Sequence, residues 1–329
     1  MKVGLIRGAY LSQFEMQTYE KLMPEVELEA YKIRINRFSA DAIRVPVRPL
    51  RCIDDPITAV SPKLGFYFNL FLQASCGLDY YHYGLVQALA DKDIAHTMET
   101  FNAFSHQALQ AKREHGCRLA VTVWENRPFA AERFAAKRRM KYDVIREADV
   151  FLAMSHRAAE CLKLEGADPA RIRVLYPGFD LERFQPRPKP QQLCQSAGIA
   201  SDEFVFLSVA ALRWEKGVYD ILYALKKVVE EKPGRRIRLL YAGSGPERKA
   251  LIKRAAQLGL ETNVTFTRFP YTRMHEAYNM ADAFILASTA RRGWLEQFGY
   301  VLGEAMASGT PILATQSGPI AEVLGDAGL

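Results

Sequence analysis

Two glutamates, Glu296 and Glu304, are the residues of this sequence best suited to hold a ligand. Glu296 lies in a predicted loop, and residues 300–307 then predict a helix that ends before Gly309. The first N–H groups of a helix have no partner within it, so they can bind phosphate or sugar oxygens. The spacing indicates an elongated polyol with a phosphate in its middle, held by one glutamate on each side.

A lysine and two glycine turns precede this stretch. Lys216 and Gly217 follow the predicted strand 204–209, where the lysine charge at a helix N-terminus would suit a diphosphate. Arg213 can share that role, and a surface lysine in an ordinary turn is the alternative. Turn glycines after the next strand would let a ligand approach the backbone, although such a turn is also common without a ligand. These glycines are Gly243 and Gly245.

The remaining candidates are placed by position alone. Arg268 and Phe269 follow a third strand, where a nucleobase could stack or bond to the backbone. In the first half, Glu125 follows the strand 119–124 and could accept a proton or hold an acceptor hydroxyl. His96, with Glu99, lies at the end of another strand, and a histidine satisfied at the sheet edge is the alternative there.

Several classes of protein are disfavoured. No histidine and carboxylate spacing suggests a metal, and nothing resembles a Ser-His-Asp set. The turn after the first strand supplies one glycine, Gly8, so a complete dinucleotide fingerprint is missing and a hydride-transfer enzyme is disfavoured. Five scattered cysteines argue against a disulfide framework. We expect no metal and no required cofactor.

Composition and charge set further limits. The chain has 329 residues and a net charge of +7, with basic residues gathered in 133–146. That basic helix is either a solvated face or a contact for anionic lipid headgroups. The uncharged aromatic segment 65–72 is either core or a surface that dips into lipid. Without an aromatic-interleaved basic array, we expect no nucleic acid partner. We expect a cytoplasmic protein, with peripheral contact at the inner membrane face as the alternative.

Short apolar runs alternate with helical patterns, which predicts an α/β fold with parallel sheets. Three prolines in 185–192 interrupt the pattern, so we expect domains at 1–184 and 201–329 joined by a linker at 185–200. The end at 325–329 suggests a truncated second domain. The candidate strands are 2–6, 93–97, 119–124, 150–154, 173–176, 204–209, 238–242, 263–267, 283–287 and 311–314.

Together these segments resemble glycosyltransferase family four, the group 1 retaining enzymes with the GT-B fold. The resemblance is carried by 148–155, 174–184, 215–217, 281–288 and above all 296–311. It implies two Rossmann-like domains facing across a cleft, with the acceptor on the first domain and a nucleotide sugar on the second.

The resemblance also implies roles for individual residues. Glu296 would accept hydrogen bonds from donor-sugar hydroxyls, Glu304 would hold the ribose, and Lys216 would neutralise the diphosphate. The expected catalytic residues are Glu296, Lys216 and Glu125. The remaining expected donor-binding residues are Arg213, Gly217, Gly243, Gly245, Arg268, Phe269, Gln297, Phe298, Gly299 and Tyr300. Gly8, His96 and Glu125 would lie at the cleft of the first domain.

The sequence departs from the family pattern at several positions. Ala211 replaces an arginine that the family usually carries, which puts phosphate affinity in question unless Arg213 compensates. Trp124 and Glu125 replace a first-domain histidine, and 289–294 is an added stretch.

We therefore expect transfer of a hexose from a nucleoside diphosphate sugar to a hydroxyl acceptor, which could be a lipid, an oligosaccharide or a small polyol. The alternatives are a non-catalytic nucleotide-sugar-binding protein and a nucleotide-sugar epimerase.

Overall fold

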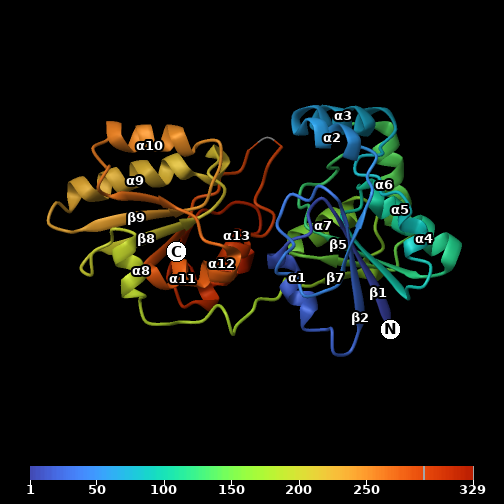
Figure 1. Ribbon diagram of the computed structural model, residues 1–329, viewed down its shortest axis with the longest axis horizontal. Helices are drawn as coiled ribbons and strands as arrows, with labels where there is room; N and C mark the ends of the chain where they lie inside the picture. The colour runs from blue at the N-terminus through green and yellow to red at the C-terminus, as the bar shows by residue number, and fades with distance from the viewer. Residues whose placement is uncertain (292, 329) are drawn as a thin grey trace. The chain divides into compact units, whose positions relative to one another are not determined.

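The chain folds into two compact units, Met1–Gly178 and Phe179–Leu329. A computed structural model describes residues 1–291 and 293–328 (Figure 1). Each unit contains one parallel β-sheet covered by helices, which confirms the predicted pair of Rossmann-like domains.

The first unit is built on a seven-stranded parallel sheet of order β3-β2-β1-β4-β5-β6-β7. Its strands are β1 (Lys2–Gly8), β2 (Glu27–Ile33), β3 (Val47–Leu50), β4 (Ile94–Met98), β5 (Arg118–Val123), β6 (Val150–Ala153) and β7 (Ile172–Val174). Its helices are α1 (Gln13–Glu20), α2 (Asp55–Val60), α3 (Pro62–Ser75), α4 (Leu85–Ala88), α5 (Ala103–His115), α6 (Ala135–Glu147), α7 (His156–Leu164) and the 3-10 turn η1 (Pro169–Arg171).

The second unit contains a five-stranded parallel sheet of order β10-β9-β8-β11-β12. Its strands are β8 (Phe204–Val209), β9 (Ile237–Ala242), β10 (Val264–Thr267), β11 (Ala283–Leu286) and β12 (Ile312–Ala314). Its helices are α8 (Gln191–Ser196), α9 (Val218–Glu231), α10 (Arg248–Gln257), α11 (Met274–Met280), α12 (Tyr300–Ala307), α13 (Ile320–Leu324) and the turns η2 (Trp214–Lys216) and η3 (Tyr271–Arg273).

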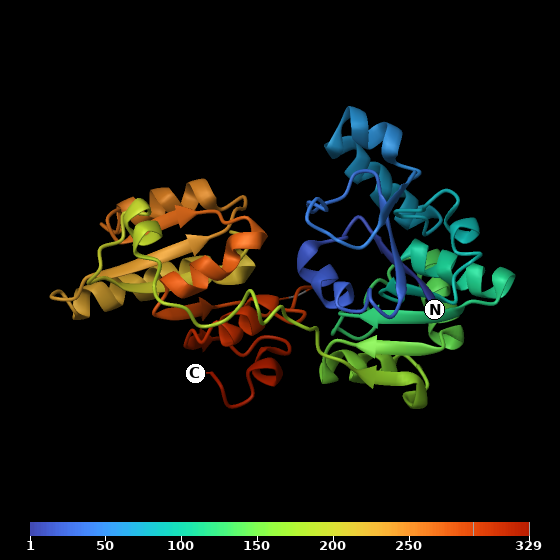
Figure 2. The same cartoon turned by 60° about the horizontal axis from the view of Figure 1, so that its bottom comes forward.

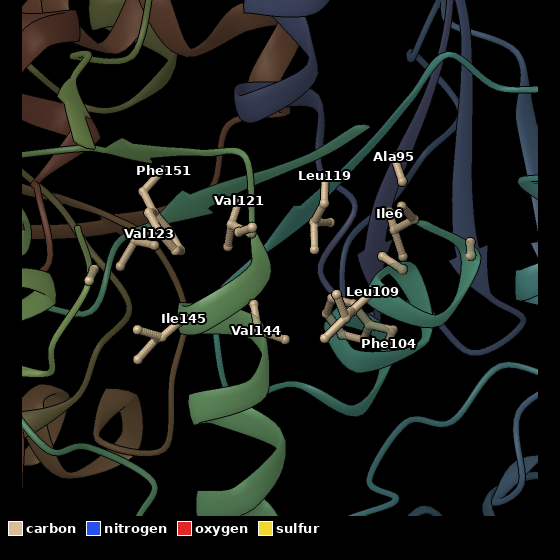
Figure 3. Packing of buried hydrophobic residues seen from close by; sticks show 14 of the residues in the cluster. Ile6, Ala95, Phe104, Leu109, Leu119, Val121, Val123, Val144, Ile145 and Phe151 are labelled. Atoms are coloured by element: carbon tan, nitrogen blue, oxygen red, sulfur yellow. The ribbon is translucent and has the colours of Figure 1, made fainter. Parts of the chain in front are cut away.

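Apolar side chains on both faces of each sheet explain why these strands read as continuous apolar runs. Val121 and Val123 of β5 are buried, and Figure 3 shows them beside Val144 and Ile145 of α6. Helices cover both faces of these strands, so side chains on both faces are removed from water. Apolar, often β-branched residues are therefore favoured at successive positions. The cores of the two sheets thereby fix the loops at the strand ends, where the candidate residues lie.

Each predicted strand overlaps an observed one, but β2 and β3 were missed. β2 alternates buried apolar residues with charged ones, so it has no continuous apolar run. β3 contains Pro49, which cannot donate to a ladder and is tolerated because β3 is an edge strand.

The segment 185–200, which we expected to link the domains, packs as part of the second unit. The unit begins at Phe179, and the buried side chains of Phe184, Cys194 and Ile199 belong to its apolar core. Apolar residues on either side of the three prolines explain this, because Phe184 precedes them and α8 forms after Pro190, which places Cys194 in the core.

Two of the basic residues gathered on α6 are buried, so this helix does not present a wholly solvated basic face. Lys137 Nζ lies 2.5 Å from an Asp79 carboxylate oxygen, and Lys141 Nζ lies 2.7 Å from Glu165 Oε1. Arg138 remains 64% exposed. The charges of α6 are therefore divided between internal ion pairs and an exposed basic edge.

The aromatic segment 65–72 lies on α3 and is largely exposed, so it is not simple core. Phe66, Tyr67 and Phe71 are 59%, 56% and 63% exposed. Within residues 1–291 and 293–328, no helix is both long enough and apolar enough to pass through a bilayer.

Candidate functional site

The second sheet changes direction between β8 and β11. From β8 the chain builds outward through β9 to β10, whereas β11 lies on the other side of β8 and leads to β12. The loops that leave two such neighbouring strands lie beyond the carboxyl ends of the strands, at the point where open α/β sheets bind ligands. The loop after β8 carries Lys216, and the loop after β11 carries Glu296.

Lys216 and Glu296 meet at this point. Lys216 Nζ lies 2.7 Å from Glu296 Oε2, and the Ser288 hydroxyl donates to the same oxygen at 2.7 Å. The lysine ammonium also lies 5.0 Å from the centre of the Trp294 ring. The lysine and glutamate side chains are only 21% and 10% exposed, so a ligand would meet them in a partly dehydrated setting. The predicted lysine and glutamate therefore converge, and Ser288 and Trp294 join them.

Gly217 allows the two loops to approach. It adopts the left-handed conformation, with a φ of +66°, and a Cβ built there would lie 1.9 Å from the carbonyl oxygen of Ala287. The Thr289 N–H also donates to the Glu215 carbonyl at 3.0 Å. A side chain at Gly217 would push the loop bearing Lys216 away from the loop bearing Ser288 and Glu296.

Replacing Gly217 by alanine should therefore destabilise the protein more than a left-handed glycine alone explains. Gly259 is a matched control, because its φ is +68° and a Cβ there meets nothing within 4 Å. We expect Gly259→Ala to cost about 1–2 kcal/mol for the strained backbone and Gly217→Ala at least about twice that, measured by denaturant unfolding. Equal losses in the two variants would contradict the tight contact between the loops.

Helix α12 begins where the sequence predicted. Its N-cap is Gly299, with a φ of +82°, which only glycine adopts without strain. Phe298 is buried, Gln297 is exposed, and Tyr300 packs edge-on against Phe298 with ring centres 6.0 Å apart. The predicted loop and helix N-terminus thus lie directly after Glu296, with the backbone of 297–300 presented at the carboxyl edge of the sheet.

Glu304 is more enclosed than expected. Its carboxylate is buried, accepting hydrogen bonds from the Tyr271 hydroxyl at 2.9 Å and the Tyr278 hydroxyl at 2.7 Å. Burial raises the pKa of Glu304 to about 7, although the two hydroxyls oppose this. Because Glu304 is 2% exposed, little of this carboxylate is open to a ribose. The two tyrosines carry no sequence signal that would have linked them to Glu304.

The glycines after β9 serve the packing of the protein itself. A Cβ on Gly243 would lie 1.9 Å from the Ala210 carbonyl oxygen, and one on Gly245 would lie 2.3 Å from that of Leu212. We expected a ligand to approach the backbone at these glycines. In the structure, the loop after β8 fills the space that a side chain would occupy at each of them. These glycines act on the candidate site by holding that loop in place.

The other candidates of the second unit lie further out. Arg213 is 58% exposed and pairs with Glu215 at 2.5 Å. Arg268 is exposed, and Phe269 packs against the apolar core of the unit. The structure thus brings Lys216, Glu296 and the start of α12 together and leaves Arg213 and Arg268 on the surface.

In the first unit, His96 is buried and does not face an open surface. It lies within β4, bonded through Nε2 to the Thr122 hydroxyl at 2.8 Å. Burial, with the Arg7 charge, lowers its pKa well below the usual value, so the ring is neutral. Gly8 is also closed, because a Cβ there would lie 2.5 Å from the Phe104 ring. His96 therefore fits our alternative interpretation, in which the histidine forms its hydrogen bond within the sheet and contacts no ligand.

Glu125 and Glu99 lie together after the neighbouring strands β5 and β4. Glu125 accepts two hydrogen bonds of 2.8 Å from the Arg127 guanidinium, so its carboxylate is already paired with a cation. Glu99 Oε1 accepts the N–H groups of Trp124 and Glu125 at 3.0 and 3.1 Å. Glu99 has a φ of +59°, an unusual strain for a residue other than glycine. The strained position of Glu99 after β4 could not be foreseen from the sequence.

Burial, and secondarily the Glu125 charge, raises the pKa of Glu99 to about 8. The folded protein therefore keeps this proton at pH values where the unfolded chain has lost it. The contribution of protonated Glu99 to the free energy of unfolding is complete below about pH 4.5 and is lost as the pH rises to 8. We expect Glu99→Gln to show a smaller fall in melting temperature between pH 5 and 8.5 than the unchanged protein. Each pKa unit corresponds to about 1.4 kcal/mol.

The control for Glu99 is Glu160→Gln, because the Glu160 side chain is 63% exposed and pairs with Lys163 on the surface. Its pH profile should follow that of the unchanged protein. A Glu99→Gln profile as steep as that of Glu160→Gln would show that Glu99 does not titrate with folding.

Two family profiles match the chain. Residues 191–328 match a profile described as Glycosyl transferases group 1, and residues 59–183 match one described as Glycosyltransferase Family 4. The chain is also 33% identical over 192 residues to a D-inositol 3-phosphate glycosyltransferase 2 from Catenulispora acidiphila. That match covers 56% of this chain and 44% of the relative, so the chain spans less than half the length of this curated relative.

Solved structures of known proteins show the same fold at low sequence identity. Anabaena HepE in complex with UDP has a TM-score of 0.74 and 19% identity, covering 98% of this chain and 82% of that one. The same protein in complex with UDP-glucose has a TM-score of 0.70 and 20% identity, again covering 98% of this chain and 82% of that one. A UDP-GlcNAc 2-epimerase from Methanocaldococcus jannaschii has a TM-score of 0.61 and 11% identity, covering 100% and 88%.

The two profiles together match residues 59–183 and 191–328, so each unit contains a matched segment, and the structural likeness covers 98% of the chain. The GT-B fold and the family resemblance are thereby confirmed. The chain belongs to glycosyltransferase family four, within the group 1 glycosyl transferases.

Proposed function

We propose that the protein transfers a hexose from a nucleoside diphosphate sugar to a hydroxyl acceptor, with retention of anomeric configuration. The observation that carries this proposal is the meeting of Lys216 and Glu296 at the point where the second sheet changes direction. An ammonium beside a carboxylate, followed by a helix N-terminus, offers a positive charge to a diphosphate and an acceptor to sugar hydroxyls.

In the proposed reaction, negative charge grows on the leaving diphosphate while the sugar ring becomes oxocarbenium-like. Lys216 would turn from Glu296 to the diphosphate, and Ser288 would keep the Glu296 carboxylate in place while that carboxylate accepts a sugar hydroxyl. The backbone N–H groups at the start of α12 would face the same ligand. Arg213 lies three residues before Lys216 and could replace its bond to Glu215 by one to phosphate, in compensation for Ala211.

The donor we propose is a uridine diphosphate hexose, because HepE, which has the same fold, was solved with UDP and with UDP-glucose. Glu304 would help to place the ribose through Tyr271 and Tyr278 rather than by direct contact, because its carboxylate is buried and bonded to both hydroxyls. Arg268 and Phe269 follow β10 and would lie near the base. We propose that no metal is required, because Lys216 supplies the positive charge.

The experiment that tests this function is incubation with UDP-glucose, with and without candidate acceptors, followed by analysis of the products. A phosphorylated polyol is the first acceptor to try, because the Catenulispora relative is named for inositol 3-phosphate. Transfer to the acceptor with the donor's anomeric configuration would support the proposal. Release of an epimer without acceptor would favour an epimerase, the activity named for a structure of the same fold. Binding without either reaction would favour a nucleotide-sugar-binding protein.

We also propose that the first unit touches a membrane surface through α2 and α3, which project from that unit (Figure 1, Figure 2). This helix pair buries polar groups and exposes apolar ones. Asp54 accepts a hydrogen bond from the buried Asn69 amide and another from the Thr58 hydroxyl. The exposed apolar side chains of this pair, called the α3 face below, are Val60, Leu64, Phe66, Tyr67, Leu70 and Phe71.

Charge supports a lipid contact for the α3 face. Lys63 is the only charged residue between Pro56 and Leu78. The neighbouring helix α6 packs against α3 and exposes Arg138 and Arg139. An apolar surface bordered by basic residues fits an anionic bilayer, where each basic residue near the surface contributes about 1 kcal/mol.

Replacing Phe66 and Phe71 by serine should weaken binding to vesicles of phosphatidylcholine and phosphatidylglycerol by at least about tenfold, because each buried aromatic side chain is worth about 1.5–3 kcal/mol. Cosedimentation measures this. Leu164→Ser is the control, since Leu164 is 63% exposed on α7 of the same unit. Unchanged sedimentation of the double variant would contradict the membrane contact.

A further inference from the structure

A pocket of about 780 Å³ lies outside the carboxyl ends of β2 and β3. Its residues come from the segments that directly follow these strands and from α2. Arg34 is the first residue after β2, and Arg51 is the first after β3. Ligands of parallel α/β sheets bind at this edge, and the volume lies within the range of small-molecule sites. The sequence did not single out this pocket.

The charges in the pocket favour an anion. Arg34 and Arg51 both line it, and both are exposed. Neither guanidinium forms a side-chain hydrogen bond or ion pair within residues 1–291 and 293–328. The acidic residue of the lining, Asp55, accepts the Cys52 N–H at 2.8 Å through Oδ2. Two unpaired guanidinium groups suit a phosphate, whose oxygens can accept paired N–H bonds.

The rest of the wall is mainly apolar. Ile35, Ile53, Ala59 and Tyr83 line it, and Ile35 is 40% exposed. Ala59 lies directly before Val60, the first residue of the α3 face and 83% exposed. The pocket therefore borders the α3 face along α2. A free phosphate ester would leave these apolar side chains in water, whereas an acyl chain leading from the phosphate would cover them.

We propose that this pocket binds the phosphate of a lipid acceptor, with Arg34 and Arg51 on the phosphate and the acyl chains along Ala59 toward the α3 face. This inference rests on the proposed glycosyl transfer and names its acceptor class, a membrane lipid with a phosphate and a free hydroxyl. Such a lipid would enter from the bilayer that the α3 face contacts. The hydroxyl that receives the sugar would project from the headgroup held by the two arginines.

The test is a calorimetric titration of the full chain with dihexanoyl phosphatidic acid, a short-chain lipid that dissolves as a monomer. Changing both arginines, Arg34→Gln and Arg51→Gln, should weaken its binding at least about tenfold, because two charge-assisted contacts are lost. The matched control is Arg44→Gln with Arg48→Gln, two exposed arginines of the same region that do not line the pocket. That control should bind as the unchanged protein does.

Inorganic phosphate and dihexanoylglycerol form the other arms of the titration. We expect each to bind at least about tenfold more weakly than the phosphatidic acid, because each lacks one half of the contact. Phosphate binding as tight as that of the lipid would overturn the lipid source in favour of a free phosphate. Equal lipid affinity in the two double variants, or no binding to the unchanged protein, would overturn the pocket assignment.

Failure of this inference is distinguishable from failure of the proposed function. Arg34 and Arg51 belong to the first unit, whereas Lys216 and Glu296 belong to the second. A titration with UDP-glucose therefore tests the donor site separately. Loss of lipid binding with intact UDP-glucose binding in Arg34→Gln/Arg51→Gln supports two separate sites. Lipid binding by a protein that neither binds nor turns over UDP-glucose would leave the pocket but remove the glycosyl transfer.

Discussion

Replacing Glu296 by alanine should lower kcat about 10²–10³-fold and leave the Kd for UDP within a few-fold of its original value. Glu296 is proposed to hold sugar hydroxyls near the reacting carbon, where misplacement affects the transition state, whereas UDP contains no hexose. Loss of one fixed group of this kind costs about 3–4 kcal/mol in other enzymes. Initial rates with UDP-glucose and calorimetry with UDP measure the two quantities.

Ser288→Ala provides a graded comparison for Glu296. Ser288 donates to Glu296 Oε2 at 2.7 Å, so its loss should loosen the carboxylate without removing it. We expect a loss of at least about tenfold in kcat, since a single hydrogen bond to a charged group contributes about 1.5–3 kcal/mol. A Glu296→Ala variant with unchanged turnover would remove the role assigned to this carboxylate. An equal loss of UDP affinity would indicate that Glu296 serves the nucleotide instead.

Replacing Lys216 by methionine should weaken UDP binding and also lower kcat, with a combined loss of about 10²–10³-fold in kcat/KM. Methionine keeps much of the apolar length of the side chain but removes the charge opposite the diphosphate. The growing charge on the leaving group then lacks its nearest cation in a partly dehydrated setting. The change also leaves the Glu296 carboxylate without its ion-pair partner, which adds repulsion toward an anionic donor.

Lys226→Met is the matched control for this change. Lys226 lies on α9 of the same unit and pairs with Glu230 at 3.2 Å on the surface, one helical turn away. Surface pairs of this type contribute little, so binding and turnover should be unchanged. If Lys216→Met bound UDP as tightly as Lys226→Met, the diphosphate could not lie against Lys216.

Much of the second unit could be predicted from local sequence. The predicted strand 204–209 coincides with β8, and the predicted helix 300–307 coincides with α12, because glycines mark both ends of that helix. In the first unit, β2 was missed because its charged residues alternate with apolar ones, and β3 because it contains Pro49. A proline argues against a strand in the sequence pattern, and only the position of the strand at the edge of the sheet shows that the proline is tolerated.

The sequence also placed Lys216 and Glu296 correctly in loops that follow strands. It could not show that these loops meet, because their convergence depends on the order of strands in the sheet. The enclosure of Glu304 by Tyr271 and Tyr278 depends on packing between residues 26 and 33 positions apart. The burial of His96 against Thr122 likewise follows from the pairing of β4 with β5. Such contacts between elements have no counterpart in local spacing.

The most direct test of the central claim is a crystal structure of the protein with UDP-glucose bound. We predict the diphosphate within hydrogen-bonding distance of Lys216 and of the backbone that opens α12, with a glucose hydroxyl on Glu296. Nucleotide sugar bound away from the loops that follow β8 and β11, with the Lys216 and Glu296 ion pair intact, would contradict the account.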